Sequence, residues 1–294
     1  MNVAAAEALP FAVRLRRSRT LHRLLRHRLF LLGAVLVTAV VLLSLLAPYI
    51  AAAPYDRMFP RSRLRPPGGQ FLLGTDHVGR DLLARVAWGG RLSLAIGLAV
   101  MLISGVLGTA IGVLSGYVRR IDNAAMRLMD ALMAFPAILL AIAISATLGG
   151  SSYSAVIALA AVYTPRTARI VRATTLVVRE MDYVKAASVA GASSLHIMWR
   201  HILPNSLAPL IVQTTFVFAF AVVAEAVLSF LGVGAQPPTP SWGNIIAEGR
   251  NYVRDAWWIT LFPGLAIALT VLGLNLVGDG LRDALDPRLK VQIG

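Results

Sequence analysis

The chain has 294 residues, of which 57% are hydrophobic and only 14% are charged, whereas soluble domains average about 25% charged residues; this balance excludes a disordered chain, argues against a soluble enzyme and indicates an all-α membrane protein. The absence of cysteine excludes a disulfide framework, a thiolate metal site and a cysteine nucleophile. The net charge of +14 comes from basic residues that flank apolar runs, so we assign it to membrane topology and lipid headgroups rather than to nucleic acid.

Six stretches of the chain are apolar enough to cross a membrane, which takes about 20 residues. They cover residues 29–50, 92–118, the two halves of 131–165, Ser206 to about Leu231, and 256–278. The uncharged stretch 131–165 is divided because, at about 1.5 Å per residue, one helix of that length would exceed the bilayer. We place the division at the turn signal Gly149-Gly150-Ser151-Ser152 and expect the fourth span to continue past Arg166.

Basic residues set the expected orientation of these spans. Residues 1–28 carry seven arginines and one acidic residue, and positive residues favour the cytoplasmic side of a membrane. Six spans then bring the C-terminal tail, residues 282–294, to the same side. The loops 51–91 and 233–255 are expected outside, the first with a short amphipathic helix, and the loop 166–205 is expected inside.

Glycines and prolines shape the predicted spans. Gly108, Gly112 and Gly116 recur every four residues on the second span, and such small residues let two helices approach closely. Pro136 and Pro263 lie inside the third and sixth spans, where they are expected to kink the helices and free backbone carbonyls. These features indicate a polytopic bundle, in which the kinks either shape a pathway or serve packing.

Glu225 is the acidic residue placed well inside an apolar run, and an ionisable group in a membrane is a functional candidate. It is either a pathway or gate residue or a carboxyl satisfied by neighbouring helices or by an adjoining subunit. The second interpretation is the simpler one, because no other carboxylate accompanies it to form a proton relay. An ion-gradient-driven secondary transporter that uses Glu225 is the alternative function, although the internal repeat that such folds often show is not evident.

The inner loop contains two short predicted helices. The first carries the small residues Ala186 and Ala187 and ends at Gly191, which can adopt the left-handed conformation that closes a helix. Ser193 or Ser194 can cap the second helix by accepting a backbone N–H bond.

The second helix presents one apolar stripe. Its members, at i, i+3, i+4 and i+7, are Leu195, Met198, Trp199 and Ile202. Pro204 is expected to end this helix. A compact helix pair with small residues and an apolar stripe is suited to docking into a groove on a soluble partner.

This loop resembles the pattern of ABC-importer permeases, which is Glu-Ala-Ala, three residues, Gly, nine residues, Ile-x-Leu-Pro. The positions that match in register are Ala186, Ala187, Gly191, Leu203 and Pro204. The chain departs from the pattern at Lys185, where the family has Glu, and at His201, where it has Ile. Lys185 reverses the charge that the family's Glu carries at this position.

Three further stretches resemble the C-type subunit of dipeptide and oligopeptide permeases, within the peptide/nickel group of binding-protein-dependent importers. They are residues 73–81, residues 225–243 and residues 278–288. The resemblance covers roughly residues 25–290 of the chain.

The resemblance implies a type I ABC importer permease fold in a bacterial-type inner membrane, with a core permease domain over residues 92–281. It implies a heterodimer with a homologous permease subunit, two ATPase domains that bind ATP and Mg²⁺, and an extracytoplasmic binding protein that delivers the substrate. The implied substrates are di- or oligopeptides. The residues that the resemblance assigns to ATPase coupling are Lys185, Ala186, Ala187, Gly191, Leu195, Met198, Trp199, Leu203 and Pro204.

No catalytic, cofactor or metal site is expected on this chain. The sequence lacks Gly-x4-Gly-Lys-Ser/Thr, so ATP hydrolysis is assigned to separate chains. Asp76, His77 and Asp81 suggest a metal site, but their spacing brings few of them together. We therefore expect caps and local ion pairs, with Thr75 or Asp76 opening the short outer helix. A non-transporting scaffold is a third function, which the kinked, glycine-rich spans disfavour.

Overall fold

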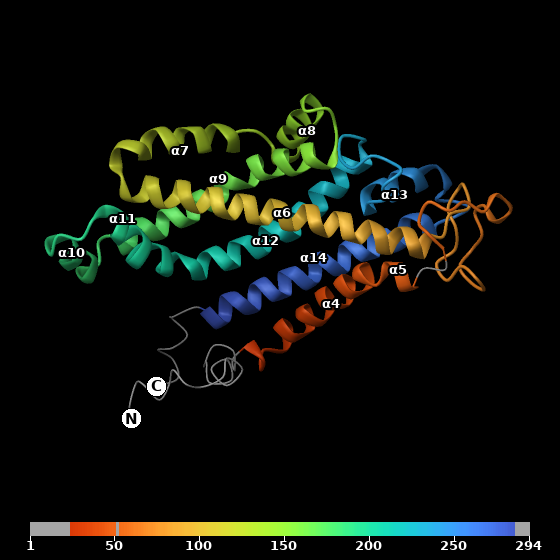
Figure 1. The fold of residues 1–294 in the computed structure, drawn as a ribbon, viewed down its shortest axis with the longest axis horizontal. Helices are drawn as coiled ribbons and strands as arrows, with labels where there is room; N and C mark the ends of the chain where they lie inside the picture. Colours follow the sequence, from red (N-terminus) through yellow and green to blue (C-terminus); the bar gives the residue numbers. More distant parts are fainter. Residues whose placement is uncertain (1–23, 51–52, 286–294) are drawn as a thin grey trace.

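The computed structural model describes residues 24–50 and 53–285. Within these ranges the chain is helical, and its only β-type pairing is isolated bridges between residues 58 and 81, which confirms the all-α class. Figure 1 shows the long helices lying lengthwise side by side in one bundle. They are α4 (Arg28–Leu45), α6 (Leu82–Tyr117), α9 (Ser152–Val178), α12 (Leu203–Phe230) and α14 (Trp258–Leu285). Most of the basic N-terminal segment and the tail from residue 286, on which the predicted orientation partly rests, lie outside the described residues.

Four of the described helices are long and apolar enough to cross a membrane: α4, α6, the continuous helix 194–230 that contains α12, and α14. A fifth crossing is possible if α7 (Arg119–Met133) and α8 (Ala137–Thr147) count as one broken span, since they are bent by 93° at a short break. The predicted fourth span is present as a helix, α9, but its arginines make it too polar to be recognised by composition alone.

Two predicted elements are wrong. The third span was expected to be one kinked helix, but the chain breaks completely before Pro136, which precedes the first residue of α8, because proline has no N–H to continue the preceding helix. The short amphipathic helix expected in loop 51–91 is also not a separate element: residues 53–81 hold a 3-10 turn at Pro60–Ser62, and residues 82–91 are the start of α6. Instead, the second span itself begins ten residues early, and Asp81 caps it by accepting from the Leu83 N–H at 3.0 Å.

The glycines of α6 let α9 approach its backbone, as predicted. A Cβ placed at Gly108, Gly112 or Gly116 would lie within 2.6 Å of an α9 atom, and at Gly112 that atom is the carbonyl oxygen of Ala168. The two helices pack along most of their length. Of the predicted intrahelical prolines, Pro263 lies inside α14.

Buried ion pairs join the start of α6 to α13 (Trp242–Gly249), which lies in the predicted outer loop 233–255. The carboxylate of Asp76 accepts from Arg80 at 2.5 Å and from Arg85 at 2.9 Å, and Arg85 also donates to Glu248 at 2.6 Å. The side chain of Arg85 is 1% exposed and that of Asp76 is wholly buried. This ion-pair cluster fastens the loop before α6 to the end of the bundle that carries α13 (Figure 1).

The charges of this cluster are matched. Burial works against ionisation of Asp76, but the Arg80 backbone N–H and the guanidinium groups of Arg80 and Arg85 outweigh it, so the pKa of Asp76 lies below its ordinary value. Burial likewise opposes ionisation of Glu248, and the same two arginines lower its pKa overall. Asp76, His77 and Glu248 have ligand atoms within 4.8 Å of one another, but the two guanidinium groups that hold the carboxylates oppose a cation there.

Gly112→Ala is expected to destabilise the protein by about 1–3 kcal/mol, because the new methyl group would meet the Ala168 carbonyl and force α6 and α9 apart. The matched control is Gly264→Ala in α14, where a Cβ meets nothing within 4 Å and alanine favours the helix. Thermal unfolding in detergent measures both variants. Wild-type stability in Gly112→Ala would contradict the close packing.

Asp76→Asn is expected to cost about 3 kcal/mol, because it leaves the two buried guanidinium groups of Arg80 and Arg85 to share the single carboxylate of Glu248. The control is Glu180→Gln, whose ion pair with Lys185 is largely exposed on both sides and contributes about 1 kcal/mol at most. Thermal unfolding at pH 7 measures the difference between the two variants. A cost for Asp76→Asn as small as that of the control would rule out a stabilising role for the cluster.

The same cluster predicts how the wild type responds to acid. Because the folded pKa values of Asp76 and Glu248 are lowered, their contribution is complete above the ordinary carboxyl pKa of about 4 and is lost as the pH falls through the lowered values. Asp76→Asn should therefore lose less stability than the wild type on acidification.

Candidate functional site

The predicted coupling loop lies at the end of the bundle opposite α13 (Figure 1). It is shorter than the expected range 166–205, because α9 continues to Val178. The remaining residues form α10 (Asp182–Val189), a turn, and α11 (Ser194–Ile197), which leads through a π-helical stretch, Met198–Ile202, into α12. The tip of this structure is therefore α10 with the turn that follows it.

Gly191 closes α10 in the predicted way. Its φ is +88°, a left-handed value that side chains other than glycine rarely adopt. The Gly191 N–H donates to the Ser188 carbonyl at 3.1 Å, and the Ala192 N–H donates to the Ala187 carbonyl at 3.0 Å. These two bonds satisfy the last carbonyl groups of α10 and fix the direction in which the chain leaves it.

Almost all of α10 is exposed, yet it is anchored to the bundle. Lys185 and Ala186 are exposed and Ala187 is half-buried. Val184 alone in this helix is buried, and it packs with Ile197 and Ile202 in a small apolar core. Lys185, which replaces the family's Glu, forms an ion pair with Glu180 at 3.4 Å. Both side chains are largely exposed, so this pair adds little stability.

The segment after Gly191 confirms the predicted cap and corrects the predicted helix end. Ser193 caps α11 by accepting from the His196 N–H at 3.3 Å. Pro204 was expected to end the helix, but the helix passes through it into α12. The π-helical stretch explains this, because the Leu203 N–H bonds five residues back to the Met198 carbonyl, and this wider turn accommodates a proline that has no N–H to donate.

The π-helical stretch also changes which side chains face the bundle. Ile197 and Ile202 are buried, whereas Leu195 and Trp199 are exposed. Met198 is half-buried. The four residues of the predicted apolar stripe therefore do not all face outward.

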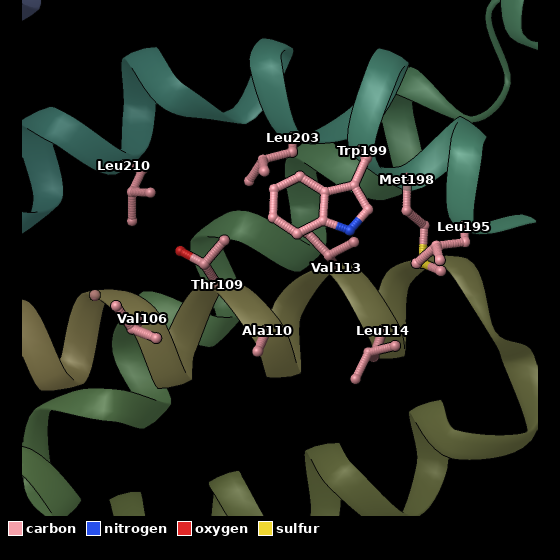
Figure 2. Close-up of a pocket in the computed structure, with 11 residues that line it drawn as sticks. Val106, Thr109, Ala110, Val113, Leu114, Leu195, Met198, Trp199, Leu203 and Leu210 are labelled. Carbon is pink, nitrogen blue, oxygen red and sulfur yellow. The ribbon is translucent and has the colours of Figure 1, made fainter.

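Leu195, Met198 and Trp199 line an apolar pocket of about 480 Å³, which lies between α6 and the start of α12. Figure 2 shows the indole ring of Trp199 between the two helices, with Leu203 on one side and Met198 and Leu195 on the other. The predicted coupling residues thus divide into an exposed tip, at positions 185–191, and a set that faces this pocket, with Pro204 beside it at the start of α12.

Glu225 is wholly buried on α12. Its Oε1 accepts from the Ser229 hydroxyl at 2.7 Å, one turn further along the same helix. Its Oε2 has no hydrogen-bond partner among the described residues. The side chain therefore lies inside the chain's own bundle.

The structure contains a second pocket that the sequence did not predict. It has a volume of about 460 Å³, lies between α9, α12 and α14, and includes Arg166, Gln213 and Arg282. In the sequence Arg166 directly follows the uncharged stretch 131–165, at a point where the fourth span is expected to continue. That position is the signal for the pocket, since an arginine inside a span is by default a functional candidate.

Comparison with known proteins agrees with this architecture. The family described as "Binding-protein-dependent transport system inner membrane component" matches residues 108–291. The N-terminal TM domain of oligopeptide transport permease C matches residues 16–67. The first match alone covers more than half of the chain.

Similar proteins match almost end to end. The chain is 58% identical over 273 residues to a putative peptide transport system permease protein of Brucella abortus, covering 93% of this chain and 92% of the relative. It is 48% identical to a di/tripeptide transport system permease protein of Pseudomonas aeruginosa, with 88% of each covered. It is 44% identical to a probable D,D-dipeptide transport system permease protein of Escherichia coli, covering 87% and 86%.

These relatives are membrane permeases rather than enzymes, and the resemblance first identified around Gly191 is confirmed across the chain. The chain belongs to the family of inner membrane components of binding-protein-dependent transport systems.

Proposed function

We propose that this chain is a transmembrane subunit of an ABC importer for di- and oligopeptides and forms half of its translocation pathway. The observation that carries the proposal is the match to peptide and dipeptide permeases at 43–58% identity over about nine-tenths of the chain. Its partners are a second, homologous permease subunit, two ATPase domains that bind ATP and Mg²⁺, and an extracytoplasmic binding protein. The membrane lipid surrounds the bundle.

The proposed topology has six crossings with both termini in the cytoplasm. Four helices are apolar enough to cross by themselves, and the broken pair α7–α8 supplies a fifth. The sixth is α9, whose 27 residues reach about 40 Å at 1.5 Å per residue. Two of its three arginines are neutralised by α7, through Asp130 and Asp122, which lowers the cost of placing α9 in a membrane.

The exposed tip, residues 185–191, is the proposed contact with an ATPase. It is accessible, it is closed by a rigid turn at Gly191, and it is fixed to the bundle through Val184. It also connects two membrane helices, α9 before it and the helix 194–230 after it. A displacement of the tip by closing ATPase domains is therefore transmitted to both helices as a rigid-body movement. ATP drives the change only through its different affinities for the two states.

Co-purification tests the proposed function. The tagged chain is extracted from native membranes in mild detergent, and its partners are identified by mass spectrometry. A second permease and a chain with a Gly-x4-Gly-Lys-Ser/Thr loop are expected. Purification of the chain alone, after detergent controls, would contradict the importer and transfer interest to Glu225 as a coupling residue.

Gly191→Asp is expected to reduce peptide uptake at least about ten-fold, while the complex still assembles and hydrolyses ATP. The reason is that an L side chain is strained at a φ of +88°, so the tip loses its fixed direction. Uptake and ATPase activity are measured on the same proteoliposomes.

The matched control is Gly149→Asp, at the opposite end of α9. Gly149 has a φ of +91° and, like Gly191, open space around its Cβ position, so the backbone strain is similar. Uptake near the wild-type rate is expected for this control. Normal uptake by Gly191→Asp would exclude the tip as the coupling element.

A further inference from the structure

The second pocket combines positive charge with an apolar wall. It is lined by Arg166 and Ile170 of α9, by Pro209, Gln213 and Phe216 of α12, and by Arg282 of α14. These three helices are far apart in sequence and converge at the pocket. Its volume of about 460 Å³ is within the range of small-molecule sites.

Among the described residues, neither arginine of the pocket has a carboxylate partner. Neither Arg166 nor Arg282 takes part in an ion pair within residues 24–50 and 53–285, although Arg169 and Arg172, on the same helix as Arg166, pair with Asp130 and Asp122. Of the three arginines of α9, Arg166 lines the pocket, and it is the one whose charge no carboxylate of the described residues neutralises.

Gln213 makes the pocket more selective. The residue is 7% exposed, and no hydrogen bond to its side chain is found in the described part of the chain. Its amide atoms are not among the buried polar atoms without a partner, so the amide is accessible from the pocket. An amide offers both a donor and an acceptor and can therefore bond both groups of a peptide bond.

The depth of Arg166 narrows the class of ligand. It lies 12 residues before the end of α9 at Val178, about 18 Å along the helix axis. In the proposed topology this position is inside the membrane, where an uncompensated arginine must face a water-filled cavity or an anion. Arg282 lies near the end of α14, closer to the cytoplasm in the proposed topology. The pocket thus has one positive charge at the depth of the membrane and a second one toward the cytoplasm.

We propose that Arg166, Arg282 and Gln213 form a transient site for the terminal carboxylate and adjoining peptide bond of the transported peptide, on the cytoplasmic half of its pathway. This inference rests on the proposed function. Every peptide has one terminal carboxylate whatever its sequence, and a guanidinium group binds a carboxylate through two parallel hydrogen bonds. Asp279, one turn before Arg282, does not line the pocket and leaves this charge available.

The site selects the carboxylate and tolerates different side chains. Phe216 and Ile170 provide apolar surface without hydrogen-bonding groups, so they accept varied residues at little cost. Both arginines are exposed in the isolated chain, and the interaction is therefore weak enough to allow release.

The test compares a peptide with and without its carboxylate. The complete transporter is reconstituted with its binding protein, and uptake of alanyl-phenylalanine and of its C-terminal amide is measured at concentrations that saturate the binding protein. Because all variants use the same binding protein, its own selectivity cancels when the carboxylate-to-amide rate ratio of each variant is divided by that of the wild type.

Arg166→Gln and Arg282→Gln should each lower this ratio about ten-fold, the equivalent of one charge-assisted interaction, and Arg166→Lys should retain part of it. Arg169→Gln is the control on the same helix, because its exposed pair with Asp130 lies outside the pocket, and its ratio should be that of the wild type.

Three results would overturn the site. The first is an equal slowing of both substrates, which indicates a structural role for the arginines. The second is an unchanged ratio. The third is a loss seen only in vesicles that contain phosphatidylglycerol and absent in pure phosphatidylcholine, which assigns the arginines to lipid phosphate. A wild-type transporter that carries neither peptide would instead refute the proposed function itself.

Discussion

The close approach of α6 and α9 is the constraint on which the rest of the bundle depends. Gly112 has no side chain, so the Ala168 backbone can lie against it, and in a membrane such packing replaces the hydrophobic driving force available in water. The orientation of α9 in turn determines what its other faces contact. Arg169 and Arg172 form ion pairs with carboxylates of α7, and Arg166 lines the pocket between α9, α12 and α14.

The same packing explains how a small exposed helix can act on a long bundle. α10 follows α9 directly and is held through Val184, while the helix from Ser194 continues into the membrane without a break. Pro204 does not interrupt this connection, because the π-helical turn before it absorbs the missing N–H bond. At the opposite end, the ion pairs of Asp76 and Arg85 fix the start of α6. When the tip is displaced, the opposite end of the bundle is therefore held in place by these ion pairs.

The sequence predicted local features whose signals are local. The left-handed glycine at Gly191 and the cap at Ser193 were both correct, because each depends on the chemistry of one residue and its immediate neighbours. Features that depend on distant partners were missed. Arg85 joins Asp76 to Glu248, which lies 163 residues beyond Arg85 in the chain. The break at Pro136 is a local feature by contrast, and the sequence predicted it only as a kink. The pocket at Arg166 needs three helices to converge, which hydrophobic periodicity does not report.

Site-specific crosslinking tests the contact between the tip and the ATPase most directly. The chain has no cysteine, so Val189→Cys on α10, where the valine is 90% exposed, gives a single attachment point for a maleimide-benzophenone probe. Tyr153→Cys, at the far end of α9 and 83% exposed in the wild type, is the control. We predict that illumination of the intact complex joins residue 189, and not residue 153, to the nucleotide-binding subunit, with a yield that changes when ATP is added. Absence of a crosslink from residue 189, in a complex that retains its ATPase subunits, would contradict the proposed coupling.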